Sequence, residues 1–219
     1  MVTPAELVEA ALNARVNLIA VTDHDSMACV KEVEQRGEGV GLAVVAGQEI
    51  TTAWPAQTHV LGWYLKAPVK SGMSLADSVA AIHDQGGLAI IPHPFMPVYF
   101  GSIQPDMLRR LLERHHVDGI EMMFTAPVGA RRRRQLEEFY SRNSERLGAQ
   151  IGGSDCHFGE HDIARVLTGY DGDFRTAVQL RATRPQIGPN QGHVPIALAV
   201  RQQWRALVNL PLRRLRGEL

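Results

Sequence analysis

The sequence predicts an α/β fold built from parallel βα units. Short apolar runs of strand length, such as 18–21 and 88–91, alternate with longer segments whose apolar residues recur at helical spacing. This alternation is typical of parallel sheets flanked by helices, and the helical segments are too frequent for an all-β protein. The length of 219 residues fits one globular domain, and α/β barrels reach this size undivided.

The first helix has a complete start signal. Thr3 can cap it, Pro4 suits its first position, and Glu6 lies three residues after the cap, where it can close a capping box. The first apolar run, 18–21, follows this helix and ends in a polar segment, which predicts a buried strand.

The remaining elements follow in the same alternating order. Gly86 and Gly87 close one helix and Gly148 closes a longer one, since glycine is favoured just past a helix end. A turn is predicted at 54–57. Helices are expected at 31–36, 75–85, 105–115, 131–147 and 174–181, and strands at 42–45, 59–65, 88–91, 119–123 and 150–152.

The composition changes near the end of the chain. Residues 1–183 are predicted to form a barrel domain, and residues 184–219 a C-terminal tail that packs on it. Within the tail, apolar residues in 204–215 recur at roughly helical spacing, which favours a docking helix over a weakly basic surface segment. The run 131–134 is four consecutive arginines, which point all round a helix. We interpret it as a solvated face rather than a phosphate or RNA patch.

The overall composition argues against several classes of protein. Lys+Arg and Asp+Glu are equal at 23 each, so no global charge favours nucleic-acid or membrane binding. Two cysteines cannot make a disulfide framework, and no signal peptide or membrane-spanning stretch is expected. These features predict a cytoplasmic protein without a membrane contact, and no stable protein partner is inferred.

Side chains that bind metal ions follow the apolar runs. His24 follows the first run, Glu49 the second, His93 a later one, and Asp155 and His157 the last. In a barrel of parallel strands, side chains at the carboxyl ends converge on one face, where active sites lie. Imidazole suits Zn, Fe and Mn ions, and carboxylate suits harder ions. Each residue alone is more simply a hydrogen-bonded loop residue, but their joint placement predicts a metal centre.

Four motifs lie where these runs end: Thr22-Asp23-His24-Asp25, Gly47-Gln48-Glu49-Ile50, Ile91-Pro92-His93-Pro94 and Gly153-Ser154-Asp155-Cys156-His157. In order and spacing they resemble successive motifs of the PHP (polymerase and histidinol phosphatase) superfamily of metal-dependent phosphoesterases. The resemblance runs from Thr3 to about Arg181, and the short, TrpH-like members are the most similar subgroup.

The resemblance implies a distorted (β/α)7 PHP-type barrel that holds two or three divalent metal ions, which would be Mn, Zn or Fe. It implies that Glu49 bridges two ions and that Asp155 and His157 share in catalysis with it. Asp23 and Asp25 would then orient His24. The implied metal ligands are His24, Glu49, His59, His93, Asp155 and His157.

Two other residues have open roles. Glu121 lies at the end of a predicted strand, where it could touch substrate or hold a ligand, and Arg165 could bind a second phosphate through its charge. His83, His115 and His116 fall inside helix patterns, so we do not expect them to supply ligands to the centre.

The sequence departs from the family pattern at its start. The family begins with a strand ending in His-x-His, followed by Ser-Asp-Gly and Thr-Pro-x-x-Leu, whereas this sequence opens at Met1-Val2-Thr3-Pro4. We therefore expect a barrel without its first strand, fewer bound metal ions, and weak or no activity in this chain. A mistaken start at Met1 is the simplest explanation, and a truncated paralogue is the alternative.

The resemblance implies that the protein is an enzyme that hydrolyses a phosphomonoester or a phosphodiester with metal-activated water. The subgroup acts on nucleoside 3',5'-bisphosphates or the 5' ends of short RNA, so we expect a small phosphorylated substrate, a nucleotide or a short RNA. Two alternatives stay open. One is amide or ester hydrolysis at the same site, since fold and ligands do not settle the bond cleaved. The other is a non-catalytic chain that acts as a binding module.

Overall fold

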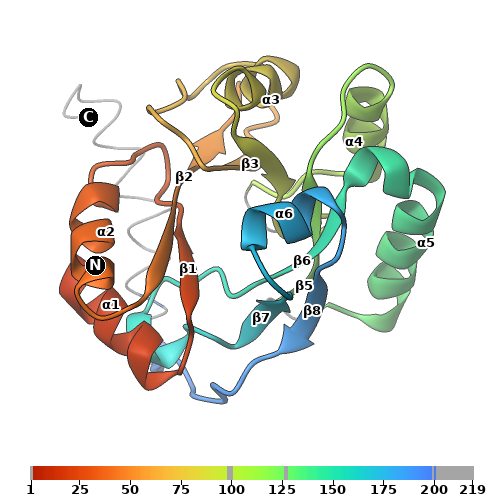
Figure 1. The fold of residues 1–219 in the computed structure, drawn as a ribbon. Helices are drawn as coiled ribbons and strands as arrows, with labels where there is room; N and C mark the ends of the chain where they lie inside the picture. Colours follow the sequence, from red (N-terminus) through yellow and green to blue (C-terminus); the bar gives the residue numbers. More distant parts are fainter. Residues whose placement is uncertain (1, 98–100, 126–127, 199, 201–219) are drawn as a thin grey trace.

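The computed structural model describes residues 2–97, 101–125, 128–198 and 200. Its main feature is a six-stranded sheet that curls strongly into a half-barrel, so the predicted α/β class is confirmed as a distorted, incomplete barrel (Figure 1). A separate two-stranded sheet lies beside the last strand of the large one. The large sheet contains, in spatial order, β1 (Leu18–Val21), β2 (Ala43–Thr51), β3 (His59–Trp63), β4 (Leu88–Ile91), β5 (Gly119–Phe124) and β6 (Ala149–Gly153), and the small sheet contains β7 (Val166–Gly169) and β8 (Arg184–Ile187).

The direction of β3 differs from the prediction of parallel βα units. β1 pairs with β2, β4 with β5 and β5 with β6 in parallel, but β3 is antiparallel to both of its neighbours. The connection from Thr51 to His59 is too short for the crossover that a parallel pair needs, so the chain turns back as a hairpin. The turn predicted at 54–57 lies in this hairpin, and β3 is the exception among the predicted parallel βα units.

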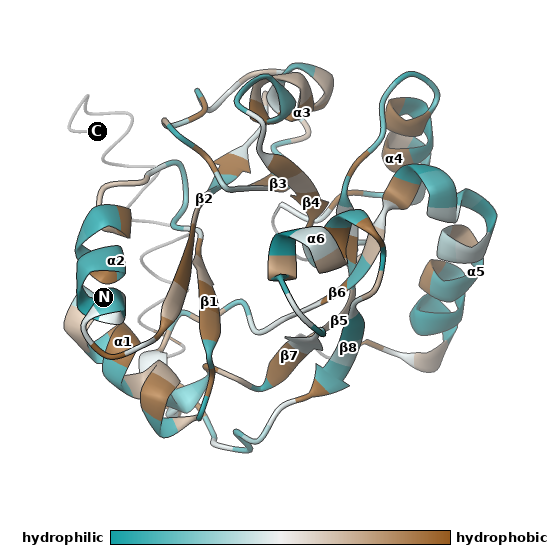
Figure 2. Cartoon of the chain, viewed as in Figure 1, coloured by the Kyte–Doolittle hydropathy of each residue, from teal (hydrophilic) through white to brown (hydrophobic). Residues whose placement is uncertain are grey.

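All the helices but the last pack on the outside of the curled sheet (Figure 1). Their outward faces are polar and their inward faces apolar, as the colouring of α2 and α5 shows (Figure 2). The predicted capping box of the first helix is confirmed: the Glu6 N–H donates to Thr3 Oγ1 and the Thr3 N–H donates to a Glu6 oxygen. The helices are α1 (Pro4–Asn13), α2 (Val30–Glu38), α3 (Leu75–Asp84), α4 (Pro105–Leu112), α5 (Ala130–Leu147) and α6 (Phe174–Gln179), with a 3₁₀ turn, η1 (Gly159–His161).

The amino ends of the strands are filled by α6, which lies across the ring of strands (Figure 1). The ring of Phe174 on α6 lies 5.6 Å from the ring of Trp63 on β3, and both belong to an apolar cluster inside the half-barrel. The other buried members of this cluster are Val45, Leu61, Leu88, Ile90, Ala149, Ile151 and Val178. Because this cluster occupies the amino ends, a polar site inside the sheet has room only at the carboxyl ends.

Several boundaries differ from the sequence expectations. The strands β7 and β8 were not expected, and β8 begins at Arg184, within the segment predicted as a tail. The helix expected at 105–115 ends at Leu112, so His115 and His116 lie after it rather than inside it. The docking helix predicted at 204–215 lies outside the described residues. Among those residues, no helix combines the length and the apolar character that crossing a bilayer requires.

We predict that Gln48→Ala destabilises the fold more than Gln85→Ala does. Gln48, on β2, is buried, and its amide both donates to the Val69 carbonyl at 3.0 Å and accepts from the Val69 N–H at 2.8 Å. Its loss leaves two buried backbone groups unpaired, which costs about 3 kcal/mol. The amide oxygen of Gln85 accepts from the N–H groups of Lys66 and Ala67, but it is partly exposed, so water can replace it.

Urea unfolding of the two variants and the parent protein measures this difference. We expect the loss for Gln85→Ala to stay near 1 kcal/mol. Equal losses in both variants would contradict the role of Gln48 as a buried anchor of β2.

Candidate metal centre

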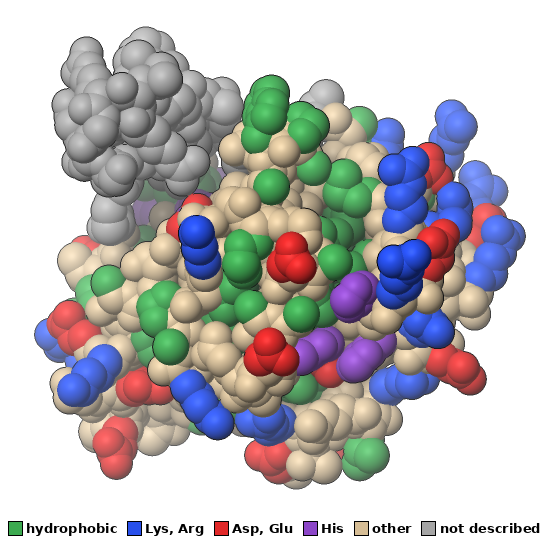
Figure 3. All heavy atoms as spheres, turned by 90° about the horizontal axis from the view of Figure 1, so that it is seen from above, with side chains coloured by type: hydrophobic (Ala, Val, Ile, Leu, Met, Phe, Trp, Pro, Cys, Tyr) green, Lys and Arg blue, Asp and Glu red, His purple; other side chains and the backbone are tan. Residues whose placement is uncertain are grey.

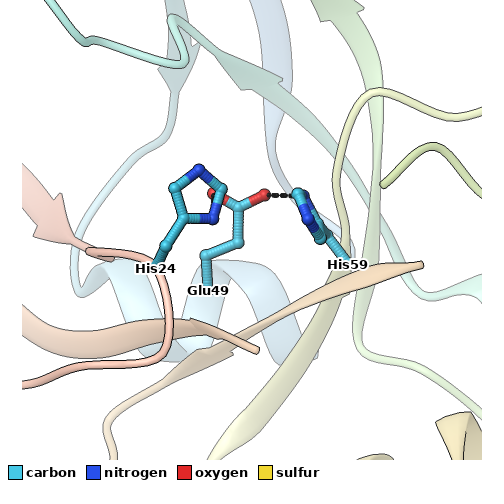
Figure 4. Close-up of side chains that lie close together, drawn as sticks. All are labelled: His24, Glu49 and His59. Carbon is cyan, nitrogen blue, oxygen red and sulfur yellow. Dashed lines mark ion pairs between the residues drawn. The ribbon is translucent and has the colours of Figure 1, made fainter. Parts of the chain in front are cut away.

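Three elements bring His24, Glu49 and His59 together at the carboxyl end of the first strands. His24 follows β1 and forms an isolated parallel bridge with Glu49 of β2. In the β2–β3 hairpin Thr51 pairs with His59, and residues two apart on a strand share a face, so Glu49 and His59 point to the same side. Figure 4 shows the three side chains converging, with the carboxylate between the two imidazole rings.

The donor atoms of this group are close enough to share a ligand. Glu49 Oε1 lies 2.6 Å from His59 Nδ1, and Glu49 Oε2 lies 3.4 Å from His24 Nδ1. One donor atom from each residue lies within 4.8 Å of the others. The carboxylate and His59 are buried, whereas the His24 side chain is 49% exposed. One side of the group is therefore open to solvent.

The other predicted ligands extend this group on both sides. His93, after β4, places Nε2 3.3 Å from Glu49 Oε1, and its ring lies 5.6 Å from the ring of His59. On the other side the ring of His157 lies 5.9 Å from the ring of His24, and its Nδ1 is 3.5 Å from Asp155 Oδ1. The structure thus brings all six residues into one chain of neighbouring side chains.

Glu49 stays ionised although it is buried. Burial alone would raise the pKa of its carboxyl group, but the hydrogen bonds of His59 and His93, with the charges of His59 and His24, together outweigh that effect. The pKa of Glu49 is therefore held well below its ordinary value. A buried carboxylate in this state needs cationic partners, which protonated imidazoles or bound metal ions can supply.

Two of the histidines hold their protons more tightly than usual. Burial, the largest single effect, would lower the pKa of His93, but its hydrogen bond to Glu49 and the charges of Glu49, Glu121 and Asp155 together raise that pKa by more. For His157 burial also acts downward, and the charge of Asp155 with a hydrogen bond to the Asp155 carbonyl makes the net shift upward. Because a metal ion binds neutral imidazole, loading the centre has to displace these protons.

The backbone around His24 is fixed by its two aspartates. Asp25 Oδ1 accepts from the Thr51 N–H at 2.8 Å, and the Asp25 N–H donates to the Glu49 carbonyl at 2.8 Å. Asp23 accepts from the Cys29 thiol at 2.7 Å, and this contact helps burial raise the thiol pKa to about 12. These contacts fix the segment that carries His24.

Three of the predicted site residues have left-handed backbone angles. Asp25, His93 and Asp155 have φ values of 53°, 29° and 48°. Such conformations are costly for residues other than glycine, and they cluster at functional sites, where the surrounding structure imposes them. Here each one turns the chain sharply just after a strand and so directs a polar side chain toward the centre.

Glu121 lies inside β5 rather than at its end, and it supports His93. Its Oε2 accepts from the backbone N–H of His93 at 2.7 Å. Burial raises its pKa to about 7, because the nearby charge of His93 only partly offsets the loss of water. Gly153 on β6 makes room for this carboxylate, since a Cβ there would collide with Glu121 Oε1.

Asp162 organises the loop that carries His157, and no motif in the sequence singles it out. Its carboxylate is buried and accepts from the N–H groups of His157 and Phe158 at 2.7 and 2.9 Å. The Cys156 thiol donates to it at 3.0 Å. An aspartate five residues after a histidine is a weak signal in sequence, because its partners are backbone groups of a loop.

Arg165 occupies a different environment from the six ligand residues. Its guanidinium donates to the Gly192 carbonyl, and its own carbonyl accepts from the Gly188 N–H. The residue therefore ties the segment after β8 to the start of β7.

The donor set fits divalent transition-metal ions. Imidazole nitrogens suit Zn, Mn and Fe, and an ionised carboxylate between them can contact more than one ion. A second group, His83, His116 and Asp118, also has donor atoms within 4.8 Å of one another, and it lies at the other end of β5.

Comparison with known proteins places this geometry in context. No family model matches the chain. The chain is 30% identical over 95 residues to an uncharacterized protein of Methanocaldococcus jannaschii, a match that covers 43% of this chain and 54% of that protein. It is also 30% identical over 91 residues to a 5'-3' exoribonuclease of Haemophilus influenzae, covering 41% of this chain and 33% of that enzyme. The chain thus spans about half or less of the length of these relatives.

The fold is similar to that of a solved two-domain protein of Bacteroides vulgatus that contains a predicted PHP-like metal-dependent phosphoesterase. The TM-score is 0.68 at 18% identity, and the match covers 86% of this chain and 61% of that one. The chain therefore has the PHP-like metal-dependent phosphoesterase fold and is distantly related to 5'-3' exoribonucleases.

We predict that Gly101→Ala disturbs the centre more than Gly72→Ala does. Both glycines have left-handed backbones, with φ of 81° and 75°, so both substitutions carry a conformational cost of about 1–2 kcal/mol. A Cβ at Gly101 would also collide with the ring of His59, whereas a Cβ at Gly72 meets open space. We expect Gly101→Ala to lose a further 1–3 kcal/mol or so through this overpacking. Urea midpoints measure the difference, and equal losses would contradict the contact.

We predict that Glu121→Gln gains stability relative to the parent protein as the pH rises from about 4.3 to about 7 in the presence of a chelator. The pKa of Glu121 is about 7 in the fold and about 4.3 in an unfolded chain. Between these values the unfolded chain releases the proton first, so ionisation favours unfolding by up to about 1.4 kcal/mol per pH unit. Glutamine keeps an acceptor for the His93 N–H and does not titrate.

Urea unfolding at several pH values measures this effect, and Glu137→Gln, which changes an exposed carboxylate on α5, is the matched control. A stability difference between Glu121→Gln and the parent that stays constant across this range would show that the pKa is not raised.

Proposed function

We propose that this chain is a hydrolase that cleaves phosphate esters with divalent metal ions bound at His24, Glu49 and His59. The observation that carries the proposal is a buried, ionised carboxylate met by imidazoles from three separate elements. The PHP-like fold of the chain and its exoribonuclease relatives support the same reaction class. We further propose that the ions are Mn, Zn or Fe and that this chain binds one or two of them.

A bound divalent ion would supply a nucleophilic water at neutral pH and offset negative charge on the phosphate. The residues of the chain would position that chemistry. Glu49, whose two oxygens face different histidines, would bridge neighbouring ions. His59 and His93, both buried, would fix the dry side of the centre. Asp155 and His157 would complete it on the side of the exposed His24, where substrate can enter.

The substrate class follows from the relatives and from charge. We propose a nucleotide or the 5' end of a short RNA, because two curated relatives in different organisms are 5'-3' exoribonucleases. Arg165 is our candidate for a second phosphate, since a guanidinium can exchange the Gly192 carbonyl for phosphate oxygens. Two unpaired cysteines suit a reducing, cytoplasmic location.

We predict that the metal-loaded chain hydrolyses phosphate esters and that His59→Ala lowers kcat/KM by about 100-fold or more. His59 is a direct donor, and even residues that only orient a ligand are worth about 10–100-fold. The chain is treated with chelator, reloaded with Mn²⁺, Zn²⁺ or Fe²⁺, and assayed on bis-p-nitrophenyl phosphate, a nucleoside 3',5'-bisphosphate and a 5'-phosphorylated RNA. His115→Ala is the matched control, because it removes an imidazole from the segment between α4 and β5, which supplies no residue to the centre.

The other outcomes separate the alternatives. Cleavage of an anilide or a carboxylic ester without cleavage of any phosphate ester would replace the proposal by an amide or ester hydrolase. Metal-dependent RNA binding without turnover would replace it by a binding module. Equal activity of His59→Ala and the parent protein would contradict the assignment of the centre.

A further inference from the structure

A second group of metal-binding side chains lies apart from the centre at Glu49. His83 is in the last turn of α3, His116 lies in the segment between α4 and β5, and Asp118 immediately precedes β5. One donor atom from each lies within 4.8 Å of the others. Figure 3 looks on the molecule from above and shows histidine side chains gathered at the surface.

The position of this group excludes a shared site with the Glu49 centre. Asp118 precedes the first residue of β5, whereas His93 follows the last residue of β4. Because β4 and β5 are parallel, the two groups lie at opposite ends of the same strand pair. The apolar cluster around Ile90 and Trp63 fills the space inside the sheet between these ends.

The carboxylate of Asp118 is held rigidly by the backbone. Its Oδ2 accepts from the Ala89 N–H at 2.7 Å, and its own N–H donates to the Ala89 carbonyl at 2.8 Å. The Asp118 carbonyl in turn accepts from the Ala149 N–H at 2.8 Å. A donor fixed between two strands in this way needs little reorganisation to bind an ion, and backbone hydrogen bonds of this kind orient metal ligands.

The two imidazoles are arranged side by side against this carboxylate. His83 Nε2 lies 2.8 Å from Asp118 Oδ2, and the rings of His83 and His116 are stacked with centroids 4.7 Å apart and planes 17° apart. A simple hydrogen bond between His83 and Asp118 explains two of the three residues. It leaves unexplained why the exposed ring of His116 stacks beside them, where it offers a third donor atom.

The three donor atoms need only a small movement of the side chains to bind one small divalent ion. Zn–N and Zn–O bonds of about 2.0–2.1 Å place tetrahedral donors about 3.4 Å apart. The three donor atoms of this group lie within 4.8 Å of one another, so some of them have to move closer together. His83 Nε2 and Asp118 Oδ2, at 2.8 Å, are already closer than that spacing and need to move apart only slightly. His116 is exposed and can move by rotation of its side chain to close the rest.

We propose that His83, His116 and Asp118 form a second, surface metal site that takes one transition-metal ion, with Zn²⁺ as the probe. Two imidazoles and a carboxylate match the ligand types of Zn²⁺ sites, and three protein donors leave a fourth position to water. An ion there would fasten α3 to the amino ends of β4 and β5 from outside. The proposal is independent of the phosphoesterase activity, because its evidence is a separate group of residues.

The test counts Zn²⁺ ions bound by the full chain after chelator treatment, using a chromophoric competitor at fixed free Zn²⁺. We expect the parent protein and His115→Ala to bind one more ion per chain than His116→Ala. His115 is the neighbouring histidine and lies outside the group, so it controls for removal of an imidazole from the same segment. We expect the affinity of this ion to fall by more than the roughly 10–100-fold that loss of an orienting partner costs.

Two further measurements keep the result clear. His83→Ala should lose the same ion, and the histidine ring ¹⁵N resonances of the parent protein should shift for His83 and His116 at the same Zn²⁺ equivalent. Equal ion counts for the parent protein, His116→Ala and His83→Ala would overturn the proposal. So would loss of the ion in His115→Ala alone.

Discussion

The buried carboxylate of Glu49 is the constraint on which the arrangement of the first three strands depends. An ionised group without water around it is costly unless opposite charge and hydrogen bonds surround it. Here those partners are His59 at 2.6 Å, His93 at 3.3 Å and His24 at 3.4 Å, and they come from the segments that follow β1 and β4 and from the start of β3. The carboxylate therefore favours the one arrangement of these elements that brings the three rings together.

The apolar core decides at which end of the sheet such a group can exist. Phe174 and Val178 of α6 cover the amino ends of the strands together with Trp63, and no water is needed there. At the carboxyl ends His24 stays half exposed. The amino ends of the strands thus supply packing energy. The carboxyl ends tolerate the strained backbone of Asp25, His93 and Asp155. Stability and chemistry are separated along the length of the same strands.

Much of this arrangement can be read from the sequence, because periodicity and capping are local. The Thr3–Glu6 capping box and the order of strands and helices are of this kind. The placement of His24, Glu49 and His93 as neighbours followed from their positions after strands, and that of His59 from the resemblance to the PHP motifs, without coordinates. The antiparallel direction of β3 depends on the length of its connection to β2, which is too short for a crossover and so forms a hairpin.

What the sequence could not show depends on contacts between distant segments. The strand β8 is short and mostly exposed, so it carries no apolar pattern, and its pairing with β7 makes it a strand. The support of His93 by Glu121 requires Gly153 on the next strand to be bare, and no spacing rule links these three residues. His116 was expected inside a helix, yet α4 ends at Leu112 and the histidine lies at the surface beside His83.

The two histidine groups differ in what stabilises their carboxylates, and this difference bears on how each responds to metal. Glu49 is buried and depends on imidazoles, and its hydrogen bond and charge help to raise the pKa of His93. Asp118 is partly exposed and already receives the Ala89 N–H. The Ala89 N–H, His83 Nε2 at 2.8 Å and solvent already surround its charge, so no ion is required there. Metal binding at Glu49 therefore competes with protonation of His93, whereas binding at Asp118 would add an ion to a carboxylate that already has its partners. For that reason the Glu49 centre is coupled to the stability of the surrounding strands, and the Asp118 group can be filled or empty with little change in the fold.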